Sequence, residues 1–125
     1  MACENQVVNT IFQTLDQKLA RDILVLDVRA LTTMTDYFVL ATGGSDRQVQ
    51  ALCDHVEDAL AKQGIFPTNK EGYRSGEWVL LGFDDAVVHI FQEETRDFYQ
   101  LERIWQDAGV VDMSDLAAED EAKKQ

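Results

Sequence analysis

A glycine-rich turn between an apolar run and a capped helix is the feature of this sequence that most restricts its fold. The run Tyr37–Ala41 is short and apolar, as expected for a buried strand. The turn Gly43–Ser45 follows, and its serine forms a capping box with Gln48, which predicts the start of a helix. Apolar spacing extends this helix over about Asp46–Gln63, with Gly64 as a left-handed terminator. A strand, a tight turn and a helix packed on that strand therefore form the centre of an α/β fold.

Three further apolar runs are predicted to be strands. The run Ile23–Val28 is almost wholly apolar and rich in β-branched residues, which favours a strand covered on both faces. The runs Trp78–Leu81 and Ala86–Phe91 flank the four residues Gly82–Asp85, a pattern typical of an antiparallel hairpin. The segment Ile65–Gly76 contains the only proline and is predicted to be a loop with room for one short edge strand.

Two more helices are predicted, one at each end of the apolar region. The first begins near Val7, and its buried stripe is predicted to be Val8, Ile11, Phe12, Leu15 and Leu19. The other spans roughly Glu93–Asp107, and its stripe is Phe98, Leu101 and Trp105. The resulting order of helices and strands contains too few helical crossovers between strands for a doubly wound parallel sheet. We therefore predict an α/β fold with a mixed sheet of about five strands flanked by helices.

The 125 residues are enough for one domain, and 46% of them are hydrophobic, which is enough for a core. Residues 1–111 are expected to form this domain. Residues 112–125 are acidic with little apolar content, and are expected to be a disordered tail.

The charge of the chain is strongly negative, with 23 acidic and 11 basic residues and a net charge of -12. Five of the acidic and two of the basic residues lie in residues 112–125, so 18 acidic and 9 basic residues remain in residues 1–111. Such a body repels phosphate backbones, which argues against autonomous nucleic-acid binding and favours a basic protein partner. The alternative is that the acidity only maintains solubility.

The composition also bears on the compartment. No segment approaches the ~20 apolar residues of a membrane span, so no membrane partner is expected. The two cysteines, Cys3 and Cys53, do not suggest a disulfide framework. A reducing, cytoplasmic location is therefore expected.

The residues that could support catalysis do not form a convincing site. The turn Gly43–Ser45 could bind phosphate, but it lacks the lysine of a P-loop, and a purely structural turn is the favoured interpretation. Asp84 and Asp85 could bind metal, but adjacent side chains diverge, and a turn-forming role is favoured. Cys53 and His55 point to different faces of their helix, so no zinc site is predicted. His89 lies in an apolar strand, where a core histidine is more common than a catalytic one.

The residues that could form a protein interface are more informative. Trp78 opens a strand directly after an acidic loop, so its indole is either a partly exposed interface anchor or a buried core side chain. Arg96, Tyr99 and Glu102 share one face of the last predicted helix at a spacing of three. They form either an internally paired surface or part of a docking patch.

Four segments together resemble the ribosomal silencing factors of the Iojap group in order and spacing. The resemblance covers about residues 7–107. The segments that carry it are Asp36–Val49, Gly76–Leu81, Val87–Phe91 and Arg96–Trp105.

The resemblance implies a nucleotidyltransferase-like α/β fold that has been adapted to binding, with no cofactor, no metal and no enzymatic activity. Members of the family bind ribosomal protein L-fourteen on the large ribosomal subunit and block the small subunit, which represses translation. Peripheral contact with ribosomal RNA and a homodimer are further implications. The interface residues implied for this chain are Trp78, Val79, Asp85, Arg96, Tyr99 and Glu102. Gly82 departs from the pattern, since the family usually has an aspartate there.

Two other functions remain open on the sequence. A metal-dependent nucleotidyltransferase is favoured by the turn Gly43–Ser45 and by the fold kinship that the resemblance implies. A homodimeric scaffold unconnected to ribosomes is the third reading.

Overall fold

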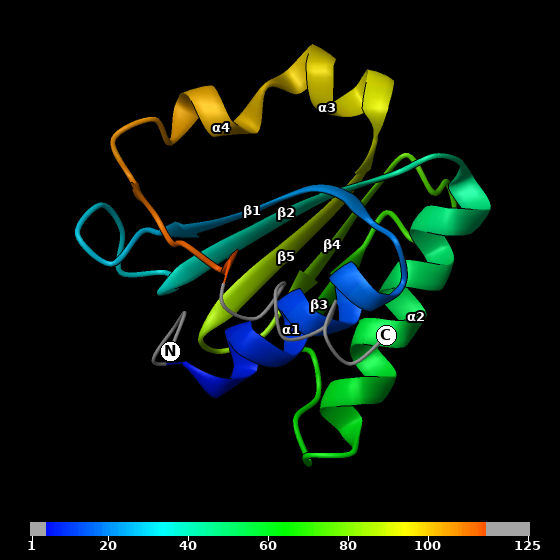
Figure 1. The fold of residues 1–125 in the computed structure, drawn as a ribbon, viewed down its shortest axis with the longest axis horizontal. Helices are drawn as coiled ribbons and strands as arrows, with labels where there is room; N and C mark the ends of the chain where they lie inside the picture. Colours follow the sequence, from blue (N-terminus) through cyan, green and yellow to red (C-terminus); the bar gives the residue numbers. More distant parts are fainter. Residues whose placement is uncertain (1–4, 115–125) are drawn as a thin grey trace.

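A computed structural model describes residues 5–114 of the chain, which form a six-stranded sheet with helices on both faces (Figure 1). The elements in chain order are α1 (Gln6–Gln17), β1 (Arg21–Asp27), β2 (Tyr37–Gly43), α2 (Asp46–Ala61), β3 (Asn69–Glu71), β4 (Trp78–Gly82), β5 (Ala86–Gln92), α3 (Glu93–Tyr99), α4 (Leu101–Ile104) and β6 (Gly109–Val110). The strand order is β3-β4-β5-β2-β1-β6. Only β2 and β5 are parallel neighbours, which confirms the predicted mixed sheet. The short β6 is the strand that the sequence did not predict.

The main core lies between the sheet and the pair α1 and α2 (Figure 1). Alternate strand residues point to this face, and the predicted stripes of both helices are buried against them. Leu19 is the exception, because its side chain is 72% exposed. The reason is that α1 ends at Gln17, and Leu19 takes a left-handed conformation with φ 67° in the turn that follows. The core strand residues on this face are Val25, Tyr37, Val39, Ala41, Val79, Leu81, Ala86, Val88 and Ile90.

The start of α2 is capped nearly as predicted. The Ser45 hydroxyl accepts a hydrogen bond from the Gln48 amide at 3.0 Å. The Gln48 side chain returns a bond to the backbone, but it accepts from the amide of Gly44 and not from that of Ser45. A side chain at Gly43 would lie 2.9 Å from the Val49 methyl group, so this glycine permits the close packing of helix on strand.

The second face of the sheet is partly covered by α3 and α4, and the single helix predicted there is broken. Gln100 separates the two helices with a left-handed conformation, φ 48° and ψ 53°. The break changes the phase of the apolar stripe. As a result Phe98 is 79% exposed, contrary to the prediction, while Leu101 and Trp105 pack on the sheet as predicted.

The folded body continues past the predicted boundary at residue 111. After β6, the Val111 amide donates to the Val25 carbonyl, and Met113 is buried in the core beside α1. Residues 112–114 therefore belong to the folded body, and the remaining predicted tail, 115–125, lies outside the described residues. None of the helices within residues 5–114 has the length and apolar character needed to cross a membrane.

Candidate functional site

The sheet face opposite α1 and α2 carries the most distinctive surface of the protein. The helices α3 and α4 cover only part of this face (Figure 1). Several large apolar side chains therefore remain half-buried on it. Such a surface is typical of an interaction site on a soluble protein. We call this surface the open face and define it by its half-buried residues, Phe38, Trp78, Leu80, Val87 and Trp105.

Trp78 is held in a fixed orientation at one end of the open face. Its ring stacks on Phe91 at a centroid distance of 5.0 Å and contacts the ring of Tyr99, also at 5.0 Å. Its indole nitrogen donates a hydrogen bond to Nδ1 of His89 at 3.1 Å. The side chain is thus half-buried and rigid, which combines the two alternatives that the sequence left open. A rigid, partly exposed tryptophan is suited to anchor a protein interface.

His89 lies beneath the open face and supports Trp78. It is 5% exposed, and burial lowers the pKa of its imidazole to about 4. Since the indole of Trp78 can only donate, Nδ1 must be the unprotonated nitrogen and the proton resides on Nε2. Within residues 5–114, Nε2 has no hydrogen-bond partner. The geometry therefore favours a neutral histidine that supports Trp78, which is the buried, hydrogen-bonded alternative of the sequence analysis.

The side chain of Arg96, in α3, forms hydrogen bonds to residues of β1, β2 and α4. Its guanidinium donates to the Asp22 carbonyl at 2.6 Å, to the Thr42 hydroxyl at 2.9 Å and to the Glu102 carboxylate at 2.9 Å. The side chain is 9% exposed. Arg96 and Glu102 are therefore paired internally, which is one of the two predicted alternatives. Their pair ties α3 to α4 across the break and to β1 and β2.

Tyr99 and Arg96 do not share a surface in the way the helical spacing predicted. Tyr99 is 51% exposed and faces Trp78, whereas Arg96 is buried. The ring of Tyr99 thus adds exposed aromatic area beside the indole, while Arg96 acts through the position of the helix.

Two other residues implied by the resemblance do not lie beside the indole of Trp78. Val79 is fully buried in the core beside α1 and α2, because consecutive strand residues point to opposite faces. Its side chain therefore cannot contact a partner in this structure. Asp85 lies at the opposite end of the sheet. Its carboxylate accepts from Asn5 at 3.3 Å, and its carbonyl accepts from the amides of Asp36 and Tyr37.

The turn Gly43–Ser45 and the carboxylates of the hairpin are too far apart to form one catalytic site. Tyr37 pairs with Ala86 and Gly43 pairs with Gln92, so six residue steps separate the turn from Ala86, and Asp84 and Asp85 lie just beyond Ala86. At about 3.3 Å per step this separation is about 20 Å. The amides of Gly44 and Gln48 are already hydrogen-bonded to side chains of the turn. The turn is therefore a structural cap in this protein, as the sequence favoured.

A cluster of Cys53, Asp54 and Glu57 on α2 could resemble a metal site but is internally paired. Lys70 forms an ion pair with Glu57 at 2.6 Å, and the hydroxyl of Tyr73 donates to Asp54 at 2.9 Å. Burial raises the pKa of the Cys53 thiol to about 12, which keeps it protonated. A thiol must lose its proton to bind zinc. The cluster is better explained as a structural contact between α2 and β3.

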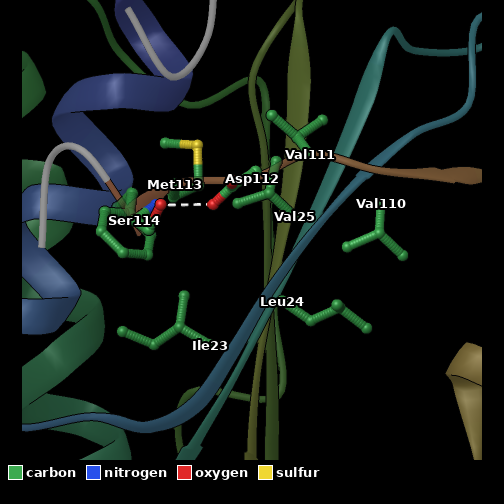
Figure 2. Close-up of a pocket in the computed structure, with 9 residues that line it drawn as sticks. Ile23, Leu24, Val25, Val110, Val111, Asp112, Met113 and Ser114 are labelled. Atoms are coloured by element: carbon green, nitrogen blue, oxygen red, sulfur yellow. Dashed lines mark hydrogen bonds between the residues drawn. The ribbon is translucent and has the colours of Figure 1, made fainter.

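A pocket of about 400 Å³ beside β1 offers few polar groups for binding or catalysis (Figure 2). Figure 2 shows that its labelled side chains are apolar, apart from those of Asp112 and Ser114. The Asp112 carboxylate accepts a hydrogen bond from the backbone amide of Ser114 at 2.9 Å. This pocket forms where the segment after β6 crosses the sheet edge.

Comparisons with known proteins decide the family. The family model described as "Ribosomal silencing factor during starvation" matches residues 2–125. A ribosomal silencing factor of Bacillus subtilis is 40% identical over 98 residues, which cover 78% of this chain and 83% of the relative. The chain belongs to the ribosomal silencing factor family.

Two further similar proteins broaden this comparison. A crystal structure from Chromobacterium violaceum superposes with a TM-score of 0.79 at 36% identity, over 81% of this chain and 84% of that one. A mouse relative named "Mitochondrial assembly of ribosomal large subunit protein 1" is 33% identical over 101 residues, which cover 78% of this chain but 44% of the mouse protein. One of the similar proteins is thus named for the assembly of the large ribosomal subunit.

Within this family member, sequence reasoning found Trp78 but missed other residues of the open face. Phe38 and Trp105 contact each other across it, with ring centroids 4.9 Å apart. The alternation of Phe38 with Leu40 could have placed Phe38 on the same face as Leu26, but no local pattern shows that this face is left partly uncovered.

Proposed function

We propose that this chain binds the large ribosomal subunit through ribosomal protein L-fourteen and thereby blocks the association of the two ribosomal subunits, which represses translation. The observation that carries the proposal is the open face, a partly exposed aromatic surface on an acidic domain of the ribosomal silencing factor family. Its action is steric and requires no cofactor and no catalytic group.

The open face has the composition of a protein interface. Trp78 and Tyr99 are aromatic, partly exposed and held in place by neighbouring rings. Tryptophan and tyrosine are the residues most often found to dominate binding energies, and a few such anchors within about 800 Å² per partner can reach nanomolar affinity. In this proposal Trp78 and Tyr99 contact the partner, whereas Val79, Arg96 and Glu102 support the surface from below or from the side.

The charge of the chain suits a basic ribosomal protein. A net charge of -12 attracts a basic partner and repels ribosomal RNA, which restricts RNA to peripheral contact. We expect the complex to associate more slowly and to weaken as salt rises, because exposed charges are screened. An affinity that is constant from low to physiological ionic strength would contradict the electrostatic part of the proposal.

The subunit preference is tested by sedimentation of the purified protein with isolated ribosomal subunits in sucrose gradients. The protein should migrate with the large subunit and not with the small one. Migration with neither subunit, by a folded protein at low salt, would overturn the proposal. The mass of the free protein, measured by analytical ultracentrifugation, tests the proposed homodimer separately.

The role of Trp78 is tested by truncation. Trp78→Ala should weaken binding to the large subunit by roughly 2 kcal/mol or more, the usual scale for an anchoring tryptophan. Leu19→Ala is the control, because Leu19 is 72% exposed and lies in the turn after α1, which packs on the other face of the sheet. If both variants fold and bind like the parent, Trp78 is not an anchor.

The absence of enzymatic activity is part of the proposal and has its own assay. The protein is incubated with magnesium and a radiolabelled nucleoside triphosphate, with Asp84→Ala and Asp85→Ala variants alongside. We expect no turnover in any sample. Turnover that depends on either carboxylate would support a metal-dependent nucleotidyltransferase instead.

A further inference from the structure

We propose that a pocket at the end of the open face farthest from Trp78 binds a basic side chain, arginine or lysine, of the protein partner, and that Asp84 is the carboxylate that selects it. This inference rests on the proposed function, because it specifies what the partner presents to the open face. We call this pocket the hairpin pocket. It has a volume of about 240 Å³, and the residues that line it include Thr35, Phe38, Gly82, Asp84, Val87 and Trp105.

The walls of the hairpin pocket suit the aliphatic part and the cationic end of such a side chain. Phe38, Val87 and Trp105 provide apolar surface against which methylene groups can pack. The rings of Phe38 and Trp105 meet edge to face at 4.9 Å, so an aromatic surface is available to a guanidinium or ammonium group. Asp84 is the one charged residue among those that line the pocket. The pocket therefore combines apolar and aromatic surface with a single negative charge.

An unsatisfied hydroxyl group in the wall points to a missing polar partner. Thr35 is 5% exposed, and within the described part of the chain its hydroxyl has no hydrogen-bond partner. Buried polar groups are normally satisfied, and leaving one unpaired costs about 1–3 kcal/mol. The guanidinium of arginine carries five donors and the ammonium of lysine three. Because the Thr35 oxygen is itself closed off from solvent, either group would reach it only after a small movement of the pocket wall.

The hairpin places its two adjacent carboxylates differently. Asp85 does not line the hairpin pocket and is bonded to Asn5 at 3.3 Å. Asp84 lines the pocket, is exposed, and has no hydrogen bond or ion pair through its carboxylate to any residue in 5–114. Asp84 is thus the carboxylate that is free to pair with an incoming cation. We therefore assign the acidic contact of this turn to Asp84 and not to Asp85.

Because Gly82 has no side chain, Asp84 is the residue of this turn that gives the hairpin pocket its negative charge. Gly82 lies in the wall of the hairpin pocket and offers no side chain. Asp84 lies two residues farther along the same turn and lines the same pocket, so it can supply the negative charge that Gly82 lacks.

The pocket and Trp78 together define a two-point surface. Trp78 and Gly82 are the two ends of β4, four residue steps apart, which corresponds to about 13 Å. A partner that covers the open face between them would place an apolar contact at one end and a cation at the other. Such an arrangement fixes the orientation of the partner as well as its affinity.

The first experiment compares Asp84→Asn with Asp85→Asn in binding to isolated large subunits. Both variants remove one negative charge from the same turn, so long-range electrostatic effects are matched. We expect Asp84→Asn to weaken binding roughly tenfold and to reduce its salt dependence, and Asp85→Asn to change it by less than about twofold. Thermal unfolding of each variant verifies that the fold is retained. Equal affinities of the two variants would overturn the assignment to Asp84.

The second experiment tests the pocket without the ribosome. The full chain, labelled with nitrogen-15, is titrated with N-acetyl-arginine amide and, as an uncharged control of the same shape, with N-acetyl-citrulline amide. We expect saturable shifts at the Trp105 indole and at the Thr35 and Asp84 amides, with a dissociation constant on the order of millimolar. The shifts should be reduced at least about fivefold in Asp84→Asn and with citrulline. No saturable shift up to about 50 mM, or equal shifts from both compounds, would overturn the proposal.

The two experiments separate the pocket from the proposed function. If the parent protein does not bind large subunits but arginine amide titrates the hairpin pocket, the pocket stands and the ribosomal partner is wrong. If the parent binds large subunits while arginine amide has no effect and the two variants bind alike, the ribosomal function stands and the pocket is not its recognition element.

Discussion

Protonation of His89 should destabilise the folded protein by about 3 kcal/mol between pH 6.5 and pH 4. The imidazole is buried, and its pKa is lowered from 6.5 to about 4. The unfolded chain therefore takes up a proton near pH 6.5, whereas the folded chain resists it until about pH 4. Between these values the unfolded state binds more protons, so stability falls as the pH falls. At 1.36 kcal/mol per pH unit, a difference of about 2.5 units corresponds to about 3 kcal/mol.

Urea unfolding of the parent and of His89→Gln at several pH values from 7.5 to 4 measures this effect. The free energy of unfolding of the parent should fall with pH more steeply than that of the variant, and the excess should be confined to the range below about pH 6.5. The difference between the two proteins removes the contribution of the carboxylates. His55→Gln, which replaces the other, exposed histidine, is the matched control variant.

Two results would contradict the predicted link between the protonation of His89 and the stability of the fold. One is an equal pH dependence of the parent and His89→Gln. The other applies even if the variant fails to fold, and it is a nuclear magnetic resonance titration of the parent in which the His89 imidazole protonates at pH 6 or above in the folded state.

Two further predictions concern the support of the open face. Arg96→Met should destabilise the fold by about 2–3 kcal/mol, because it leaves the Thr42 hydroxyl and the Glu102 carboxylate unpaired. It should also change the near-ultraviolet circular dichroism of the Trp78 and Tyr99 pair, and an unchanged spectrum would contradict a positioning role for Arg96. Gly72→Ala should destabilise the folded protein by at least about 1 kcal/mol more than Gly64→Ala, as measured by urea unfolding. Both glycines have φ near 77°, but only a side chain at Gly72 would collide with the Trp78 carbonyl. Equal losses of stability would show that the loop at Gly72 relaxes easily.

Local patterns were sufficient to predict most of the fold. The strands, the hairpin and the capped helix α2 depend on neighbours within a few residues, and the structure contains each of them. The break at Gln100 was not predictable in the same way, since a glutamine in a left-handed conformation has no sequence signature. Tertiary contacts of Arg96 and Leu101 stabilise this break. The short β6 was missed for a similar reason, because it exists through its pairing with β1.

The candidate site was only partly predictable from the sequence. Trp78 was identified because tryptophan after an acidic loop is an unusual pattern, although its support by His89 depends on a cross-strand neighbour. Strand alternation predicts that Val79 points away from the open face, and this physical argument outweighs the residue-by-residue transfer from the family. The difference between Asp84 and Asp85 depends on the conformation of the turn, which sequence spacing does not determine.

In the proposed mechanism, this protein acts by occupying the joining surface of the large subunit. Light scattering tests this mechanism on purified large and small subunits that are mixed after the large subunit has been incubated with increasing amounts of the protein. We expect the amplitude of subunit association to fall in proportion to the occupancy of the large subunit, and Trp78→Ala to require higher concentrations for the same loss. Full association of the subunits at saturating occupancy would rule out steric blocking.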